Sequence, residues 1–252
     1  MAHPILDPAH VNSALQAKCA LAVVAKAPRP GKVKTRLSPP LTSEQAAALN
    51  VSFLRDTTEN IAGVAAAGRA CGLVCYTPAG DESLFDGLLP QGFALIGQRG
   101  DGFGERLLAA AEDILACGFG AVCLIDSDSP TLPSSALKQA VDALSRSGDR
   151  IVLGGAHDGG YYLIGLKAAH REPFANIHWS TATVYAETVA AIESAGIELV
   201  ELPMWYDVDD GETLELLREE LLGGARPPFA KRSGYAASHS LEFLRELEGA
   251  RR

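Results

Sequence analysis

The sequence has 252 residues, of which 47% are hydrophobic and 21% charged, and its formal net charge is -9. This composition predicts a globular protein with one large α/β domain or two small ones. The acidic balance argues against nucleic acid as a partner, because a phosphate backbone requires a broad basic face, and no apolar stretch is long enough to span a membrane.

The N-terminus and the cysteines predict a cytoplasmic location. Residues 1–8 lack the basic start and the continuous apolar region of a signal peptide. The five cysteines are an odd number and contain no Cys-x-x-Cys pair, so they predict neither a disulfide framework nor a structural zinc site. Buried, reduced thiols are expected instead.

The first predicted strand, residues 20–25, leads into a basic loop over residues 25–37. No acidic residue lies between Asp7 and Glu44, whereas the loop carries five cations: Lys26, Arg29, Lys32, Lys34 and Arg36. Open α/β sheets bind ligands at the carboxyl ends of their strands, where several cations can meet several phosphate oxygens. The loop predicts a phosphate site, with a solvated basic loop as the alternative. Its other predicted substrate contacts are Ala25, Pro28, Gly31 and Thr35.

Helical and strand patterns then alternate. Thr42 begins a capping-box sequence, Thr-Ser-Glu-Gln, followed by apolar residues at helical spacing, which predicts a long helix. Strands are expected at 70–76 and 93–96, and a helix at 103–117. The glycine-rich residues 98–106 before this helix match neither the dinucleotide-binding nor the Walker pattern. They predict a turn beside the site in which Gln98 and Gly102 contact a nucleobase or a sugar.

The apolar run at 121–125 predicts a central parallel strand, and it ends in Asp126-Ser-Asp128. Two carboxylates on a bend beyond a buried strand can share a hard divalent cation, and a nucleotide phosphate can complete the coordination. The alternative is that Asp128 caps a helix and nothing binds. We favour a site for Mg²⁺ or Mn²⁺ at Asp126 and Asp128.

After a helix at 134–145 and a strand at 151–153, the alternation stops. Residues 155–165 predict a turn that leads directly into a strand, as in an Asp-Gly hairpin and an antiparallel pair. Asp158 is a candidate catalytic group, and Gly159, Gly160 and Tyr161 are candidate substrate contacts. His157 is a weaker acid–base candidate.

The last part of the α/β pattern contains a helix at 181–195, a strand at 198–202 and a helix at 212–222. Ser180 is expected to cap the first of these helices, with Trp179 in the core or in the wall of a pocket. Three acids, Asp207, Asp209 and Asp210, precede the second helix. One acid can cap it, and another can face the first acid pair and contact the metal.

Beyond residue 223 the pattern changes. Gly-Gly-Ala-Arg-Pro-Pro is a linker sequence. A short helix at about 237–248 follows, and its leucines predict packing against the domain or against a partner subunit. The expected organisation is one domain at 19–222 and a C-terminal helical extension at 223–252.

Four segments together resemble a bacterial family of the GT-A (nucleotide-diphospho-sugar transferase) superfamily, called rSAM/selenodomain-associated transferase 1. They are the basic loop, Ile-Asp-Ser-Asp-Ser-Pro, Asp-Gly-Gly-Tyr-Tyr-Leu-Ile-Gly, and Trp-Tyr-Asp-Val-Asp-Asp, in this order within residues 19–222. The first two are also similar to motifs of 2-phospho-lactate guanylyltransferases and, more distantly, of molybdenum-cofactor nucleotidyltransferases.

This resemblance implies a three-layer α/β/α fold of GT-A type with a mostly parallel, mixed sheet. It implies that Lys26, Lys34 and Arg36 bind phosphate, and that Asp128 and Asp209 face the metal. The superfamily's usual glycine-rich loop, Gly-Gly-x-Ser-x-Arg-Met-Gly, is absent, so the resemblance implies no nucleobase preference.

Three functions fit these observations. The preferred one is nucleotidyl transfer from an NTP to a phosphorylated small molecule, because the loop cations suit a triphosphate better than a diphosphate-sugar. The alternatives are a glycosyltransferase that uses a nucleotide-sugar, and a non-catalytic nucleotide-binding subunit. The expected partners are a nucleotide and a small-molecule acceptor, without nucleic acid or membrane, and the sequence is compatible with a homodimer.

Overall fold

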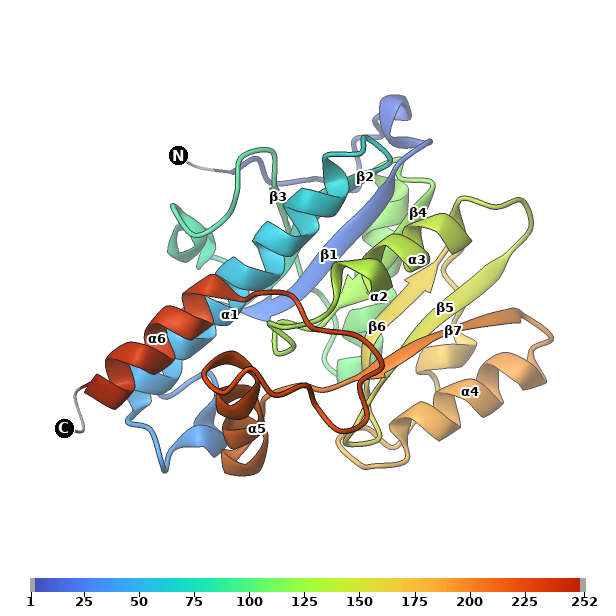
Figure 1. Cartoon of the computed structure of the whole chain (residues 1–252). Helices are drawn as coiled ribbons and strands as arrows, with labels where there is room; N and C mark the ends of the chain where they lie inside the picture. The colour runs from blue at the N-terminus through green and yellow to red at the C-terminus, as the bar shows by residue number, and fades with distance from the viewer. Residues whose placement is uncertain (1–2, 250–252) are drawn as a thin grey trace.

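The structure, a computed structural model, describes residues 3–249, and its centre is a seven-stranded sheet (Figure 1). The strand order is β3-β2-β1-β4-β6-β5-β7. Strand β6 is antiparallel to both of its neighbours, and every other pair in the sheet is parallel. The strands are β1 (Cys19–Lys26), β2 (Ala70–Thr77), β3 (Ala94–Gly97), β4 (Ala121–Ile125), β5 (Arg150–Ala156), β6 (Tyr161–Leu166) and β7 (Glu198–Trp205).

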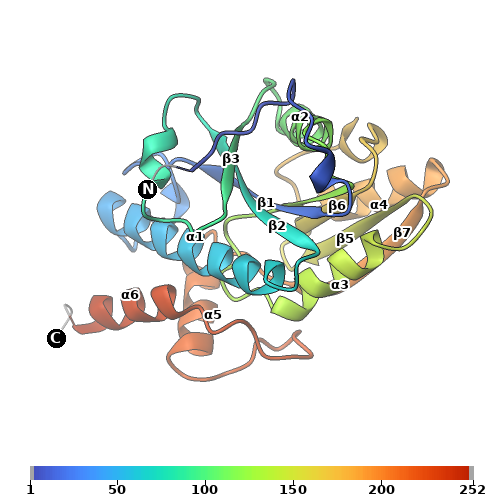
Figure 2. The ribbon, with the colours of Figure 1, turned by 90° about the horizontal axis from the view of Figure 1, so that it is seen from above.

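Helices cover both faces of the sheet, which confirms the predicted three-layer fold (Figure 2). One face packs against α1, α3, α5 and α6, and the other against α2 and α4. All of β4 is buried, because alternate residues enter the two cores: Cys123 lies in one and Val122 in the other. The helices are α1 (Ser43–Ala65), α2 (Phe103–Ala116), α3 (Ser134–Leu144), α4 (Val184–Ser194), α5 (Gly211–Leu221) and α6 (Ser238–Gly249).

The local signals for α1 and for the hairpin are confirmed. The Thr42 hydroxyl oxygen accepts a hydrogen bond from the Gln45 backbone N–H, and the Gln45 side-chain oxygen accepts one from the Thr42 backbone N–H, which completes the capping box. Strands β5 and β6 are antiparallel, and Gly159 in the turn between them has a φ of +91°, a conformation that favours glycine.

The prediction for the start of α4 is wrong. The helix begins at Val184 with Thr183 as its N-cap, three residues later than expected. Ser180 does not cap it, because its φ of +64° turns the chain before the helix. Thr181 then donates a hydrogen bond to the His178 carbonyl at 2.7 Å, which keeps this segment in a turn.

The five cysteines are free and four of them are buried, as predicted; Cys71 is partly buried. Across residues 3–249, none of the helices combines the length and the apolar character that crossing a membrane requires.

The C-terminal helix α6 packs against α1 (Figure 1). The leucines of this helix predicted packing against the domain or against a partner subunit, and the structure shows the first arrangement. Asp56, on α1, is fully buried. It accepts hydrogen bonds from the backbone N–H groups of His239 and Ser240, at 3.0 and 2.8 Å, and from the Ser240 hydroxyl. The carboxylate therefore caps the first turn of α6 from another helix. The last three residues of the predicted extension, 250–252, lie outside the described residues.

We expect Asp56→Ala to lower the free energy of unfolding by about 1–3 kcal/mol, because it leaves two N–H groups of α6 and the buried Ser240 hydroxyl without an acceptor. Urea denaturation measures this loss, and limited proteolysis should cut the extension faster. Glu59→Ala is the matched control. Glu59 is exposed and, among residues 3–249, pairs with His239 alone, so its loss should cost less than about 1 kcal/mol. Equal effects of the two changes would contradict the capping role.

Candidate functional site

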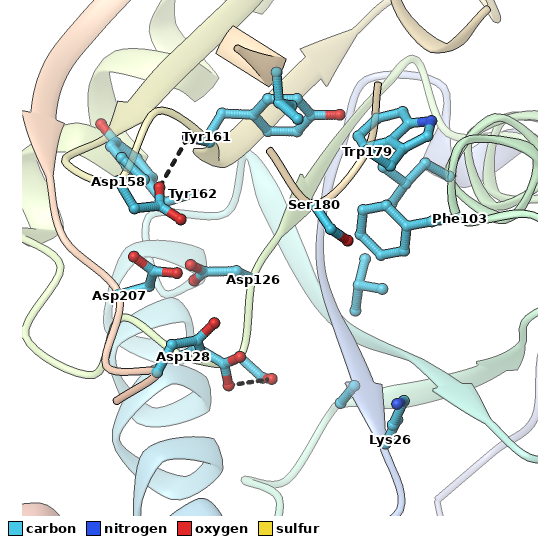
Figure 3. A pocket seen from close by; sticks show the side chains of 18 of the residues that line it. Lys26, Phe103, Asp126, Asp128, Asp158, Tyr161, Tyr162, Trp179, Ser180 and Asp207 are labelled. Atoms are coloured by element: carbon cyan, nitrogen blue, oxygen red, sulfur yellow. Dashed lines mark hydrogen bonds between the residues drawn. The ribbon is translucent and has the colours of Figure 1, made fainter. Parts of the chain in front are cut away.

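A cavity of about 740 Å³ lies at the carboxyl ends of β1 and β4 (Figure 3). These strands are parallel neighbours, so the basic loop and the Asp126–Asp128 bend leave the sheet at the same edge. Because β6 is antiparallel to β4, its first residue, Tyr161, lies at this edge too. The topology thereby brings together the motifs that the sequence separates, as open α/β sheets usually do at their binding sites.

Most of the predicted site residues line this cavity. They are Ala25, Lys26, Lys34, Thr35, Arg36, Gln98, Asp126, Asp128, Asp158, Gly160, Tyr161 and Asp209.

Four predicted contacts, all in loops, are not among the lining residues: Pro28, Gly31, Gly102 and Gly159. Gly102 is the N-cap of α2, and Gly31 has a φ of +70°. A Cβ atom at Gly159 would collide with the Ala182 carbonyl oxygen. The glycines therefore shape the loops around the cavity.

Asp126 contributes a buried carboxylate oxygen to the site. Its Oδ2 accepts a hydrogen bond from the Ser129 hydroxyl at 2.8 Å, whereas its Oδ1 is buried without a hydrogen-bond partner among residues 3–249. Burial, followed by the charges of Asp128 and Asp207, raises the pKa of Asp126 well above its ordinary value. A buried carboxylate with a free oxygen costs stability unless a cation or a ligand reaches it.

Of the three acids in the segment after β7, one caps the next helix and two line the cavity. Asp210 caps α5 by accepting a hydrogen bond from the Thr213 amide at 2.9 Å, as predicted for one of the three. Asp207 and Asp209 both line the cavity. Burial, and then the charges of Asp158 and Asp209, raise the pKa of Asp207 to about 7.

Lys34 lies inside the acid cluster. Its side chain is only 4% exposed, and its Nζ is 2.9 Å from Asp128 Oδ1, 2.9 Å from Asp209 Oδ1 and 2.7 Å from the Val208 carbonyl oxygen. Burial lowers the pKa of Lys34, but the two carboxylates outweigh this effect and the net shift is upward. Three acceptors match the three N–H donors of an ammonium group, so the ammonium holds two acidic segments together.

The other loop cations differ in their surroundings. Arg36 is exposed and pairs with Asp209 Oδ2, so both oxygens of Asp209 are taken by cations. Lys26 and Lys32 line the cavity and form no ion pair with any residue in 3–249. These two are the loop cations that a phosphate can reach without displacing a carboxylate.

A divalent cation fits the oxygens that remain. Asp126 Oδ1, Asp128 Oδ2 and the Asp207 carboxylate accept no hydrogen bond from another described residue. Carboxylate oxygens suit Mg²⁺ or Mn²⁺, and Asp126 already needs a partner. As a ligand, Asp209 would first have to release Lys34 or Arg36.

In the described part of the chain, a compact group of three possible metal ligands lies outside the cavity, where α1 meets α6. Ligand atoms of Asp56, Glu59 and His239 all lie within 4.8 Å of one another, a spacing that the cavity acids do not reach. Asp56 already accepts three hydrogen bonds there, so this group fits its capping role better than a metal. The cavity acids would have to move inward around an ion, with phosphate oxygens filling other positions.

The two acid–base candidates of the hairpin turn lie apart. His157 stacks on Phe229, with ring centroids 4.6 Å apart, and is not among the residues that line the cavity. Asp158 lines it, and its Oδ1 accepts a hydrogen bond from the Gly160 amide at 2.8 Å (Figure 3). This bond fixes the carboxylate and leaves its second oxygen for a ligand.

Trp179 lines the cavity, which is one of the two places predicted for it, the core or the wall of a pocket. Phe103 packs against the Trp179 ring, and the Arg106 guanidinium lies over the Phe103 ring. The motifs did not point to Phe103 or Arg106, because both read as ordinary residues of a helix. The signal that could have selected them is their place in the first turn of a helix that follows a strand at the binding edge.

Comparisons with known proteins identify a family and related structures. Residues 60–181 match the family described as "Uncharacterized protein conserved in bacteria (DUF2064)". The chain is similar to a candidate nucleotide-diphospho-sugar transferase from Desulfovibrio desulfuricans G20, with 31% identity and a TM-score of 0.76 over 92% of this chain and 95% of that one. No curated protein matches the sequence.

A more distant structure shares the fold alone. It is a CMP:2-keto-3-deoxy-manno-octonic acid synthetase in complex with CTP, with 12% identity and a TM-score of 0.52 over 82% of this chain and 100% of that one. The region matched by the family contains Asp126, Asp128 and Asp158, but neither the basic loop nor Asp207.

Proposed function

We propose that this chain, which belongs to the DUF2064 family of bacterial proteins, is a metal-dependent transferase that acts on a nucleotide. The observation that carries the proposal is the meeting of the basic loop and five carboxylates at one cavity on the binding edge of the sheet. The name of the D. desulfuricans relative supports the same class of substrate. The finer assignment, to the rSAM/selenodomain-associated transferases, rests on the four sequence motifs.

The reaction that we favour is nucleotidyl transfer to a phosphorylated small molecule. A phosphate oxygen of the acceptor attacks the α-phosphorus of an NTP, and a new P–O bond forms. The bond from the α-phosphorus to the bridging oxygen breaks, and pyrophosphate leaves with the electron pair of that bond. Positioning and charge neutralisation supply most of the catalysis in such reactions.

Each charged group then has a role. Asp126, Asp128 and Asp207 would hold the cation, which when bound neutralises phosphate charge. Lys26, together with Lys32, binds the leaving phosphates. Lys34 and Arg36, predicted as phosphate ligands, act mainly through Asp128 and Asp209, whose carboxylates they orient.

Glycosyl transfer from a nucleotide-sugar is the second candidate. The free oxygen of Asp158 favours it, because a fixed carboxylate beside the cavity can accept the proton of an acceptor hydroxyl. A non-catalytic binding subunit explains less, because it has little need for an acid such as Asp207, whose pKa burial and neighbouring carboxylates raise to about 7.

Incubating the protein with each NTP or nucleotide-sugar, Mg²⁺ or Mn²⁺ and a metabolite extract tests the proposal. Mass spectrometry and a pyrophosphate assay identify the products. We expect metal-dependent pyrophosphate release together with a nucleotidylated product. Free UDP or GDP would support glycosyl transfer, and tight nucleotide binding without any product would support the binding subunit. Asp142→Asn, a substitution of an exposed residue that does not line the cavity, should leave the result unchanged.

A further inference from the structure

The segment that joins α5 to α6, residues 223–237, contacts all three chain segments that carry the acids of the cavity, and we call it the C-terminal strap (Figure 1). The acid-bearing segments follow β4, β5 and β7. No residue of the strap lines the cavity, so the strap meets the site from outside, through residues that neighbour the acids. The linker that the sequence predicts here is therefore a packed part of the structure.

Phe229, in the strap, packs against two of these segments at once. Its ring stacks on His157, with centroids 4.6 Å apart and an angle of 25°. It also meets the Tyr206 ring edge-on, with centroids 6.0 Å apart and an angle of 69°. His157 directly precedes Asp158 in the chain, and Tyr206 directly precedes Asp207. One ring therefore restrains the two backbones from which these acids project.

A turn in the strap presents this ring. The Ala230 N–H donates a hydrogen bond to the Pro227 carbonyl oxygen at 2.9 Å, which places Pro228 and Phe229 at the two central positions of the turn. Proline suits the first central position, because its ring fixes φ near the value that such a turn requires. Pro227 and Ala230 are buried. The Pro-Pro pair is thus an anchored turn.

The strap reaches the segment after β4 through Thr131, three residues beyond Asp128. The Tyr235 N–H donates a hydrogen bond to the Thr131 carbonyl oxygen at 2.8 Å. A Cβ atom at Gly234 would lie 2.7 Å from the same oxygen. Only a glycine lets the two backbones come this close, so the contact depends on the residue type at this position of the strap.

Buried hydrogen bonds connect these contacts to the acids. The Thr131 hydroxyl donates to the Tyr206 hydroxyl at 3.3 Å, which in turn donates to Glu220 Oε2 on α5 at 2.5 Å. Nearer the cavity, the Val208 N–H donates to the Asp128 carbonyl oxygen at 2.9 Å. Thr131 and Tyr206 are buried. Because close-packed, hydrogen-bonded interiors transmit strain, a displacement of the strap would move the backbones that carry the acids.

We propose that the C-terminal strap positions the acids of the cavity, and that Phe229 is its central positioning residue. Carboxylates that share a cation site repel one another before the cation binds, so their backbones need support from outside the site. Residues that only orient metal ligands commonly affect metal affinity as well. This inference rests on the proposed function, because it gives the strap a role in the metal site of that function.

The test separates positioning from general stability by comparing Phe229→Ala with substitutions on the other face of the sheet. Ile114, on α2, is fully buried in the core that the strap does not contact. Ile114→Val and Ile114→Ala should bracket the loss of stability of Phe229→Ala, measured as the midpoint of urea denaturation. All variants are made in the full chain, and circular dichroism verifies that each is folded without urea.

Calorimetry then measures NTP binding to each folded variant at a series of Mg²⁺ concentrations. We expect Phe229→Ala to raise the Mg²⁺ concentration for half-maximal binding about tenfold. The two Ile114 variants should change it less than about twofold, because distant sites act independently. Phe229→Tyr keeps the ring and should behave as the wild type. If Phe229→Ala does not fold, Phe229→Leu, which retains part of the apolar contact, should give a shift in the same direction.

Hydrogen exchange of the unliganded protein gives a second readout. Phe229→Ala should speed the exchange of peptides that contain His157 and Val208, whereas the Ile114 variants should leave these peptides unchanged. Unchanged exchange there, a wild-type Mg²⁺ dependence in Phe229→Ala, or an equal shift in the Ile114 variants would overturn the inference and leave the proposed function standing. Absence of metal-dependent nucleotide binding in the wild type would refute the proposed function, and the inference with it.

Discussion

Lys34→Met is expected to lower the free energy of unfolding by about 3–5 kcal/mol. Methionine nearly matches the volume of lysine, so the packing changes little, but the ammonium between Asp128 and Asp209 is lost. Asp128 and Asp209 then lie close together without the buried ammonium between them, and the Val208 carbonyl loses the hydrogen bond that Lys34 donates. Leaving a buried charge without its partner costs far more than an exposed ion pair contributes. Urea denaturation at pH 7 measures the difference.

Arg36→Ala is the control for this prediction. Arg36 pairs with the same Asp209 carboxylate, but its side chain is 69% exposed, so its removal should cost less than about 1 kcal/mol. A large loss for Arg36→Ala, or a small one for Lys34→Met, would show that Lys34 does not hold the acid cluster together.

Asp126→Asn should keep or increase the stability of the fold but weaken metal-dependent nucleotide binding. Its stability should equal or exceed that of the wild type, because the amide removes a buried charge and can donate to the neighbouring carboxylates. The Mg²⁺-dependent part of the nucleotide affinity should fall at least about 100-fold. Changing a residue that only orients a metal ligand already lowers metal affinity about 10–100-fold, and Asp126 is proposed as a ligand itself. Calorimetry with Mg²⁺–NTP and urea denaturation measure the two effects separately.

The pH dependence of the same variant gives an independent check. The pKa of Asp126 is raised in the folded protein above its ordinary value of 3.8, mainly by burial. The folded state therefore holds this proton more tightly than the unfolded state, and wild-type stability falls as the pH rises from about 4 through the raised pKa. Asp126→Asn should lose this part of the pH dependence. A variant that is less stable than the wild type at pH 8 but still binds Mg²⁺–NTP normally would contradict both expectations.

Lys34→Met and Asp126→Asn distinguish a charged residue that stabilises the fold from one that is kept for ligand binding. Lys34 stabilises the folded chain because its ammonium has three acceptors, whereas Asp126 costs stability because one of its oxygens has none. Groups that destabilise a fold are commonly kept for function. The sign of the stability change therefore indicates which charged residues support the site and which act on the ligand.

The order of the elements could be predicted from short-range patterns. The capping box at Thr42 starts α1, the apolar run at 121–125 is the buried β4, and the glycines after Asp158 form the turn between β5 and β6. Each signal lies within a few residues of the structure that it specifies. The start of α4 was missed because Ser180 adopts a left-handed conformation, for which a serine gives no warning in the sequence.

The sequence by itself determined the fold class, the edge of the sheet where the candidate site lies, and the loops that reach this edge, because these follow from hydrophobic periodicity, turn residues and the rule that parallel strands end together. Only the tertiary structure decided what each charged or aromatic residue contacts there. The sequence predicts Lys34 as a phosphate ligand, but in the structure its ammonium pairs with Asp209, which lies 175 positions away in the chain. Phe103 and Trp179 became one wall because α2 and the segment before α4 meet beside the cavity. Burial, pairing and the resulting pKa values depend on neighbours that are distant in the chain, and no local pattern encodes those distances.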